Sequence, residues 1–203
     1  MGMFHLFYYF INYLTILVFI RSFGAALMHE PILVRDITRA MSEGCNHEIP
    51  ITVKCRIGTD ITNPNWKHPT EEDDSKLYSQ LHKFIETIAS DNIVNEFQIH
   101  ARIAVLEKNF SPLDNRQIPP LRYDIVSKLI TEFPELKFTM NGGIQTLSQA
   151  ENHLNTMEGL DGVMIGRGFL SNPWQVRNIS SFMFSHALRF LYVANKMAIV
   201  CHD

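Results

Sequence analysis

Two spacings of apolar residues alternate along residues 31–173, one typical of helices and the other typical of buried strands. Apolar residues three or four positions apart predict helices, and the first of these carries Ile32, Leu33, Ile37 and Met41 behind Pro31. Short β-branched and apolar runs predict strands. Helices are expected at 31–43, 121–133, 147–154 and near Pro173, and strands at 51–56, 96–100, 136–140 and 162–165. A further helix is expected after about residue 74, with one face marked by Leu77, Leu81, Phe84, Ile85 and Ile88.

This order of elements predicts an α/β fold built on a parallel sheet. Strands that alternate with helices are joined by crossover connections, which make neighbouring strands parallel. Four strands are too few to close a barrel, which needs eight, so the sheet is either open and doubly wound or half of a TIM (β/α)₈ barrel. A polar loop from residue 59 to about residue 74 follows the first strand and ends in the acidic cluster Glu71, Glu72, Asp73 and Asp74.

Polar residues at the ends of the four strands favour the half barrel. The strands end in Lys54-Cys55-Arg56, His100-Ala101-Arg102, Asn141-Gly142-Gly143 and Gly166-Arg167-Gly168. Barrel enzymes take catalytic groups from the carboxyl ends of several strands, and many bind phosphate between the loops after strands seven and eight. Glycine lets backbone N–H groups approach phosphate, a following helix N-terminus adds a favourable dipole, and Arg167 adds a forked cation. The four strands therefore correspond to strands five to eight.

Single members of this set have simpler explanations. An Asn-Gly-Gly segment is commonly only a turn, a lone His100 is more often structural, and Cys55 is more often a packed core thiol. Lys54 and Arg56 differ, because residues two apart share one face of a strand. Two buried cations on one face are costly unless they are paired, which favours a functional role for both.

Composition limits the partners and the compartment. The 203 residues are 46% hydrophobic and carry a net charge of −3, which argues against a non-specific nucleic-acid binder. Cys45, Cys55 and Cys201 lack metal-ligand spacing, so we expect no metal site and a reducing compartment, cytoplasmic or organellar. Residues 3–20 are uncharged and mostly apolar, and they are either a membrane anchor or a non-native start.

The strand ends belong to a longer, ordered set of motifs. Its other members are Phe23-Gly24-Ala25-Ala26-Leu27-Met28, the segments 53–58, 115–121 and 161–167, Ser111-Pro112 and Asn172-Pro173-Trp174. Over roughly residues 23–176 this set resembles the tRNA-dihydrouridine synthases, most of all the branch of bacterial dihydrouridine synthase A. The resemblance implies a barrel that binds FMN, which NADPH reduces. A hydride then passes to C6 of a uridine flipped out of tRNA, and an acidic cysteine protonates C5.

The resemblance also implies roles for individual residues. Lys54 would lie near the flavin ring and stabilise its reduced anion, and His100 would contact the flavin. The flavin phosphate would be held by five residues of the two glycine turns, Asn141, Gly142, Gly143, Gly166 and Arg167. Arg102 and Arg116 fall where the family contacts RNA.

The sequence departs from the family pattern at both ends. Leu17-Val18-Phe19-Ile20 stands where the family has a Gly-Cys-Pro-Ser segment with the catalytic cysteine, and none of the three cysteines has a matching context. No catalytic residue is therefore assigned. The expected organisation is a hydrophobic segment at 1–22, a partial flavin-binding barrel at 23–177, and an unaligned helical tail at 178–203.

Two functions remain open for such a chain. One is an FMN- and NADPH-dependent tRNA-dihydrouridine synthase that is inactive as this isolated fragment. The other is a non-catalytic remnant, with or without a membrane anchor at residues 3–20, that binds RNA or a partner. We also expect the strand face that would line the barrel to leave apolar residues uncovered, so that the fragment associates with itself.

Overall fold

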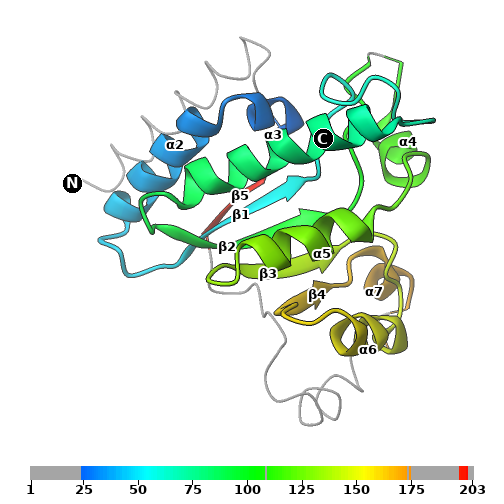
Figure 1. The fold of residues 1–203 in the computed structure, drawn as a ribbon. Coiled ribbons are helices and arrows are strands. Elements are labelled where there is room, and N and C mark those ends of the chain that lie inside the picture. The colour runs from blue at the N-terminus through cyan, green and yellow to red at the C-terminus, as the bar shows by residue number, and fades with distance from the viewer. Residues whose placement is uncertain (1–23, 108, 173, 175–196, 201–203) are drawn as a thin grey trace.

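Five parallel strands form one sheet in the order β4-β3-β2-β1-β5 (Figure 1). The computed structural model describes residues 24–107, 109–172, 174 and 197–200. The strands are β1 (Ile51–Arg56), β2 (Val94–His100), β3 (Lys137–Asn141), β4 (Gly162–Met164) and β5 (Met197–Val200). Each neighbouring pair runs parallel, which confirms the prediction from the alternating pattern.

The helices fall between the strands and gather on one side of the sheet. They are the 3₁₀-helix η1 (Gly24–His29), α2 (Pro31–Gly44), α3 (Glu71–Ala89), α4 (Pro112–Gln117), α5 (Tyr123–Glu132), α6 (Leu147–Thr156) and α7 (Arg167–Ser171). Helices α2, α3, α5 and α6 contact β1, β2, β3 and β4 respectively and lie along the same face (Figure 1). A parallel sheet with its helices on one face is the arrangement of one side of a (β/α)₈ barrel.

Helix α3 begins earlier than predicted. The hydroxyl of Thr70 accepts a hydrogen bond from the backbone N–H of Asp73 at 3.2 Å, and the Asp73 carboxylate accepts one from the backbone N–H of Thr70 at 3.0 Å. This reciprocal capping box starts the helix at Glu71. The acidic cluster therefore forms the first helical turn, where the helix dipole favours negative charge, and its assignment to the loop was wrong.

Two short elements were not expected from the sequence. Helix α4 begins behind Ser111, which forms a second capping box with Asp114. Strand β5, which pairs with β1, lies within the 178–203 segment that was expected to be helical. The rest of that segment lies outside the described residues. The hydrophobic segment 1–22 also lies outside them. Among the residues that are described, no helix is long and apolar enough to cross a membrane.

The two faces of the sheet differ sharply in polarity. The helix-covered face carries Val53, Phe97, Ile99, Phe138 and Met140, each 0% exposed and part of one core cluster with the helices. The opposite face, called the polar face below, carries Thr52, Lys54, Arg56, Glu96, Gln98, His100, Lys137, Thr139 and Asn141. On β1, β2 and β3 this face carries polar residues where we expected apolar ones, because these strands alternate in polarity. On β4 it carries Met164, the partner of Asn141.

Candidate functional site

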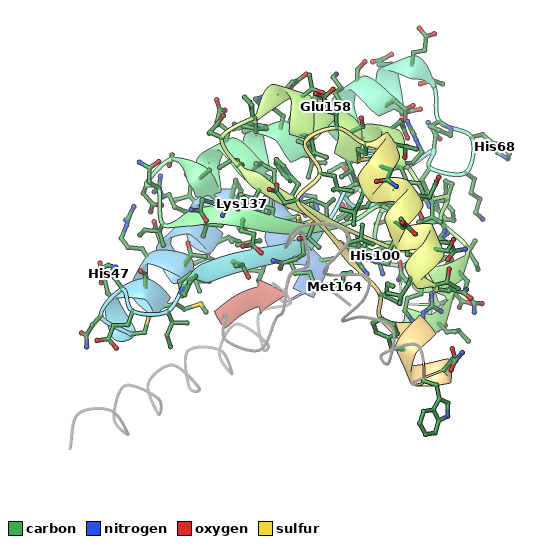
Figure 2. The ribbon with its side chains drawn as sticks, turned by 90° about the horizontal axis from the view of Figure 1, so that it is seen from below. His47, His68, His100, Lys137, Glu158 and Met164 are labelled. Atoms are coloured by element: carbon green, nitrogen blue, oxygen red, sulfur yellow. The ribbon has the colours of Figure 1, made fainter. Side chains whose placement is uncertain are left out.

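The polar face ends in one row of residues at the carboxyl ends of the strands. Arg56, His100, Asn141 and Met164 are successive partners across β1, β2, β3 and β4. Figure 2 shows His100 and Met164 near this edge, whereas His47, which precedes β1, lies at the far end of the sheet. The predicted strand ends therefore lie along a single edge, as the carboxyl ends of parallel strands must.

The turn after β3 is packed so tightly that it requires glycine. Gly142 has φ +113°, and a Cβ there would lie 2.6 Å from Cδ2 of His100. A Cβ on Gly143, at φ +72°, would lie 2.5 Å from Cδ1 of Leu121. The Tyr123 hydroxyl donates a hydrogen bond to the Gly142 carbonyl at 2.6 Å. His100 on one side and Tyr123 on the other thus fix the backbone of this turn.

Tyr123 is a site residue that the sequence analysis missed. Burial raises its pKa above the usual range, although nearby Arg102 opposes the shift, so the hydroxyl keeps its proton and acts as a donor. Tyr123 lies two residues after the 115–121 motif segment. The signal available in the sequence was a tyrosine at the start of the helix that follows this motif.

The second glycine turn lies beside the first. The Asn141 side-chain amide donates to the Met164 carbonyl at 3.0 Å, which ties the end of β3 to the end of β4. A Cβ on Gly168 would lie 2.2 Å from the backbone oxygen of Gln145, so α7 packs directly on the loop that follows Gly143. Beside Gly166 there is open space, because a Cβ there would meet no atom within 4 Å. The adjacency of the two turns is as predicted, and their binding of a phosphate stays a prediction.

The helix N-termini at this edge offer fewer free N–H groups than we expected. The first-turn amides of α6 are capped internally, since the Thr146 hydroxyl accepts from the backbone N–H of Gln149 at 3.2 Å. The Gln149 side-chain oxygen in turn accepts from the backbone N–H groups of Gln145 and Thr146. Helix α7, behind the second turn, has only five residues. Any anion here would be held by backbone amides of the turns and by arginine.

Two arginines supply positive charge at this edge. Burial lowers the pKa of Arg102, and the nearby charge of Arg167 lowers it further. The Arg102 guanidinium donates to the carbonyl of Pro119 and, at 3.5 Å, to that of Gln117, while its buried Nε has no hydrogen-bond partner. Arg167 is exposed. Two cations close enough to repel each other produce a local positive potential that an anion would relieve.

Arg56 has a structural role that its sequence context did not reveal. It is 0% exposed, and its Nη1 donates to the carbonyls of Ile103 at 3.0 Å and Asn115 at 2.9 Å. The Asn115 side chain also pairs with the main chain of Val105, accepting from its N–H at 2.7 Å and donating to its carbonyl at 2.8 Å. Arg56 and Asn115 thus hold the loop after β2 against the end of β1. Lys54, half-buried, lies one row deeper, beside Gln98.

The remaining predicted residues lie apart from the glycine turns. Arg116 is half-buried in the last turn of α4, and its Nε has no hydrogen-bond partner. Cys45 follows α2 and precedes β1, which places it at the amino end of the sheet near His47. Cys55 is 1% exposed on the helix-covered face, and Cys201 lies outside the described residues. In the described part of the chain, no group of three or more His, Cys, Asp or Glu residues could hold a metal ion.

Comparison with known proteins identifies the family. A sequence model described as "Dihydrouridine synthase (Dus)" matches residues 18–203. Proteins named tRNA-dihydrouridine(20/20a) synthase are similar to this chain, among them those of Pseudomonas syringae pv. tomato, 44% identical, and Shewanella oneidensis, 42% identical, both over 161 residues. Each alignment covers 79% of this chain and 42% of the relative, so the chain spans less than half the length of these curated relatives. The family match extends over most of the sequence, and the chain therefore belongs to the dihydrouridine synthase family.

Proposed function

We propose that this chain forms the phosphate-binding side of the flavin site in a tRNA-dihydrouridine synthase. The enzyme would reduce uridine in tRNA to 5,6-dihydrouridine, with FMN as cofactor and NADPH as reductant. Membership of the family and the names of the similar proteins support the reaction. The single observation that carries the proposal for this chain is the pair of glycine turns, packed side by side at the edge that also carries the charges of Arg102 and Arg167.

The residues at this edge fit a phosphate group. A phosphate needs backbone N–H groups that it can approach closely, together with cations. Asn141, Gly142 and Gly143 would supply one side of that cradle, and Gly166 and Arg167 the other. The open space beside Gly166 leaves room for a ligand oxygen, and the charge of Arg167 is exposed to meet it.

The polar face would contact the rest of the cofactor. Bound FMN would supply the hydride chemistry, accepting a hydride from NADPH and delivering one to C6 of uridine. Lys54 would bring a cation beside the ring, which favours the anionic reduced form. His100, fixed against Gly142, would position the ring relative to the phosphate turn. Arg102 and Arg116 would meet tRNA phosphates.

The final proton transfer to C5 has no donor among the described cysteines. Cys45 lies at the opposite end of the sheet and Cys55 points into the core beneath the helices. A positioned general acid contributes about 10²–10⁴-fold to a rate. This placement favours the second candidate function, a non-catalytic chain that binds RNA or a partner without turnover. Supplied with FMN, NADPH and unmodified tRNA, the chain is expected to yield no dihydrouridine by mass spectrometry at multiple turnover.

Binding of FMN tests the proposal directly. We expect FMN to bind more tightly than riboflavin, which lacks the phosphate, when binding is followed by quenching of flavin fluorescence. Arg167→Ala should weaken FMN binding about tenfold or more, the size of one charge-assisted contact, and leave riboflavin unchanged. Arg39→Ala is the matched control, because Arg39 lies on α2 and pairs with Asp91 at 3.0 Å. Equal affinity of the unaltered chain for FMN and riboflavin would overturn the assigned phosphate site.

A further inference from the structure

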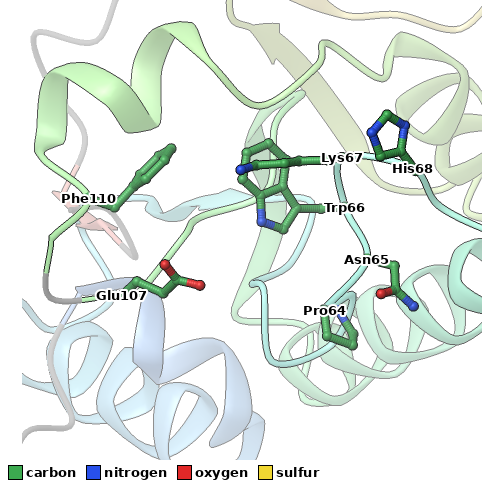
Figure 3. Close-up of a pocket in the computed structure, with 7 residues that line it drawn as sticks. All are labelled: Pro64, Asn65, Trp66, Lys67, His68, Glu107 and Phe110. Atoms are coloured by element: carbon green, nitrogen blue, oxygen red, sulfur yellow. The ribbon is translucent and has the colours of Figure 1, made fainter.

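A cavity of about 330 Å³ lies between the loops that follow β1 and β2 (Figure 3). The first loop lines it with Pro64, Asn65, Trp66, Lys67 and His68, and the second with Glu107 and Phe110. Both loops leave the carboxyl ends of their strands. The cavity therefore opens on the same edge of the sheet as the glycine turns, displaced from them toward β1.

The two walls of the cavity are tied together before any ligand arrives. The backbone N–H of Ala104 donates to the Gly58 carbonyl at 2.8 Å, and that of Asp60 donates to the Ala104 carbonyl at 3.0 Å. The Asp60 carboxylate accepts from the backbone N–H of Leu106 at 3.0 Å. Within the first wall, the Asn65 side-chain amide donates to the Asp73 carboxylate at 3.3 Å, which holds the loop to the start of α3. A preformed cavity spares a ligand the entropy cost of ordering the loops.

An aromatic pair with a cation forms the centre of the cavity. The ring centroids of Trp66 and Phe110 are 5.9 Å apart in an edge-to-face arrangement, and Trp66 is 7% exposed. The Lys67 ammonium lies 5.3 Å from the centroid of the Trp66 ring, across its face (Figure 3). Lys67 is itself exposed, so its flexible side chain can leave the ring without disturbing the core. Moving Lys67 would open an aromatic face to a flat ligand.

The polar groups around this centre match the edge of a nucleobase. Lys67 and His68 offer donors. Glu107 and the side-chain oxygen of Asn65, whose amide nitrogen donates to Asp73, offer acceptors. A nucleobase combines a flat apolar face with both donors and acceptors on its edge, and unpaired bases of RNA stack on aromatic side chains. The volume is near the lower limit for ligand sites, which suits one base and no larger group.

We propose that this cavity binds one unpaired nucleobase of the RNA substrate, other than the uridine that reacts. The base would stack on the face of Trp66, with Phe110 beside its edge, and Lys67 would turn to the adjoining phosphate. This inference rests on the proposed function, since it takes RNA as the substrate. It adds a base contact beyond the backbone contacts of Arg102 and Arg116.

The two tryptophans of the chain, Trp66 and Trp174, make the cavity observable. In the full chain carrying Trp174→Phe, emission comes from Trp66 alone. We expect an unmodified tRNA transcript to quench that emission, with the same midpoint as the polarisation of a fluorescently labelled copy of the transcript. A single-stranded oligoribonucleotide should quench it as well, and a duplex of the same sequence should not.

Each other outcome has a distinct meaning. If polarisation saturates while Trp66 emission stays constant, tRNA binds elsewhere, and the cavity proposal fails while the proposed function stands. If polarisation never changes, this chain does not bind the transcript and the nucleobase proposal is overturned, while the comparison of FMN with riboflavin still decides the proposed flavin site. If Trp66 emission changes with protein concentration in the absence of RNA, the cavity is a contact between copies of the chain and the nucleobase proposal is overturned.

Substitution of Lys67 gives an independent readout. Lys67→Ala should weaken tRNA binding about fivefold and lower the slope of log affinity against log salt by about one, as loss of a single phosphate contact does. Lys83→Ala, at an exposed position on α3, is the matched control and should change neither quantity. An unchanged salt slope for Lys67→Ala would contradict the assigned phosphate contact.

Discussion

The helix-covered face and the polar face of the sheet are built from the same strands but do different work. On the first, Phe97 and Phe138 stack with ring centroids 6.1 Å apart, inside the continuous core. On the second, rows such as Lys54, Gln98 and Thr139 run across three strands. Parallel strands are usually apolar on both faces. Here the alternation separates the residues that stabilise the fold from those that would contact a cofactor.

The largest expected effect belongs to the helix-covered face. Phe138→Ala should lower the free energy of unfolding by about 3–5 kcal/mol, because Phe138 is 0% exposed and its loss leaves a cavity. Thr139→Ala, at the next residue but on the polar face, should cost about 1 kcal/mol. Urea unfolding of the two variants measures the difference between the faces directly. Similar losses of unfolding free energy in both variants would show that the two faces contribute equally to stability.

Arg56 is an exception to this division of roles between the two faces, because it lies on the polar face but stabilises the fold. Arg56→Met should cost about 2–3 kcal/mol, because two buried carbonyls lose a charged donor. Lys137→Met, also on the polar face but exposed, should stay within about 0.5 kcal/mol of the unaltered chain. Urea midpoints report both values. A neutral Arg56→Met would mean that the loop after β2 is held without this side chain.

Residues that cap the first turn of a helix are expected to have intermediate effects on the free energy of unfolding. Thr70→Ala removes the hydroxyl that caps α3 and should cost about 1 kcal/mol. Thr70→Ser keeps a capping hydroxyl and serves as the control. Thermal unfolding separates the two variants, and equal melting temperatures for both would argue that the Asp73 half of the capping box is sufficient.

The smallest expected effect on stability depends on pH and involves an ion pair at the start of α5. Arg122 bonds both Asp74 and Asp124, with closest contacts of 2.9 and 2.8 Å, and its hydrogen bonds hold the pKa of Asp124 below the usual range. The folded pKa is then lower than the unfolded one. The stabilisation is complete above about pH 4 and is lost as pH falls through the folded pKa.

Comparison of the unaltered chain with Asp124→Asn tests this pH dependence. At pH 6 the difference in unfolding free energy should be below about 1 kcal/mol, because Asp124 is largely exposed and solvent screens the pair. The difference should narrow as pH approaches 3, and also in about 1 M salt. A difference that widens on acidification would give the opposite sign and contradict the assigned ion pair.

The sequence was sufficient where local pattern determines structure. The β-branched run at 51–56 predicted β1 with its observed bounds, and the apolar stripe of Leu77, Leu81 and Phe84 predicted α3. The start of α3 was missed although its capping residues, Thr70 and Asp73, were visible in the sequence. The adjacency of the two glycine turns followed from the βα order alone.

Other features depend on contacts between distant segments, which local pattern does not contain. Arg56 reaches carbonyls 47 and 59 residues away, so its charge gave no hint of a structural role. Tyr123 reaches the Gly142 carbonyl across 19 residues. Strand β5 pairs with β1 from a segment whose sequence matched no recognised motif. The polarity of the face opposite the helices could have been predicted from the alternation of polar and apolar residues in β2. It was missed because parallel strands are usually apolar on both faces.

The hydrogen bond from the Asn141 side chain to Met164 also bears on how this protein ages. Asparagine followed by glycine is the dipeptide most prone to deamidation, in which the glycine nitrogen attacks the side-chain carbonyl carbon to form a cyclic imide. The extended backbone at the end of β3 and the bond from the amide to the Met164 carbonyl, at 3.0 Å, both hold the side chain away from that geometry. Molecules whose β4 has frayed lose this protection first. Their product, aspartate or isoaspartate, would place a negative charge beside the very turn that is proposed to hold a phosphate.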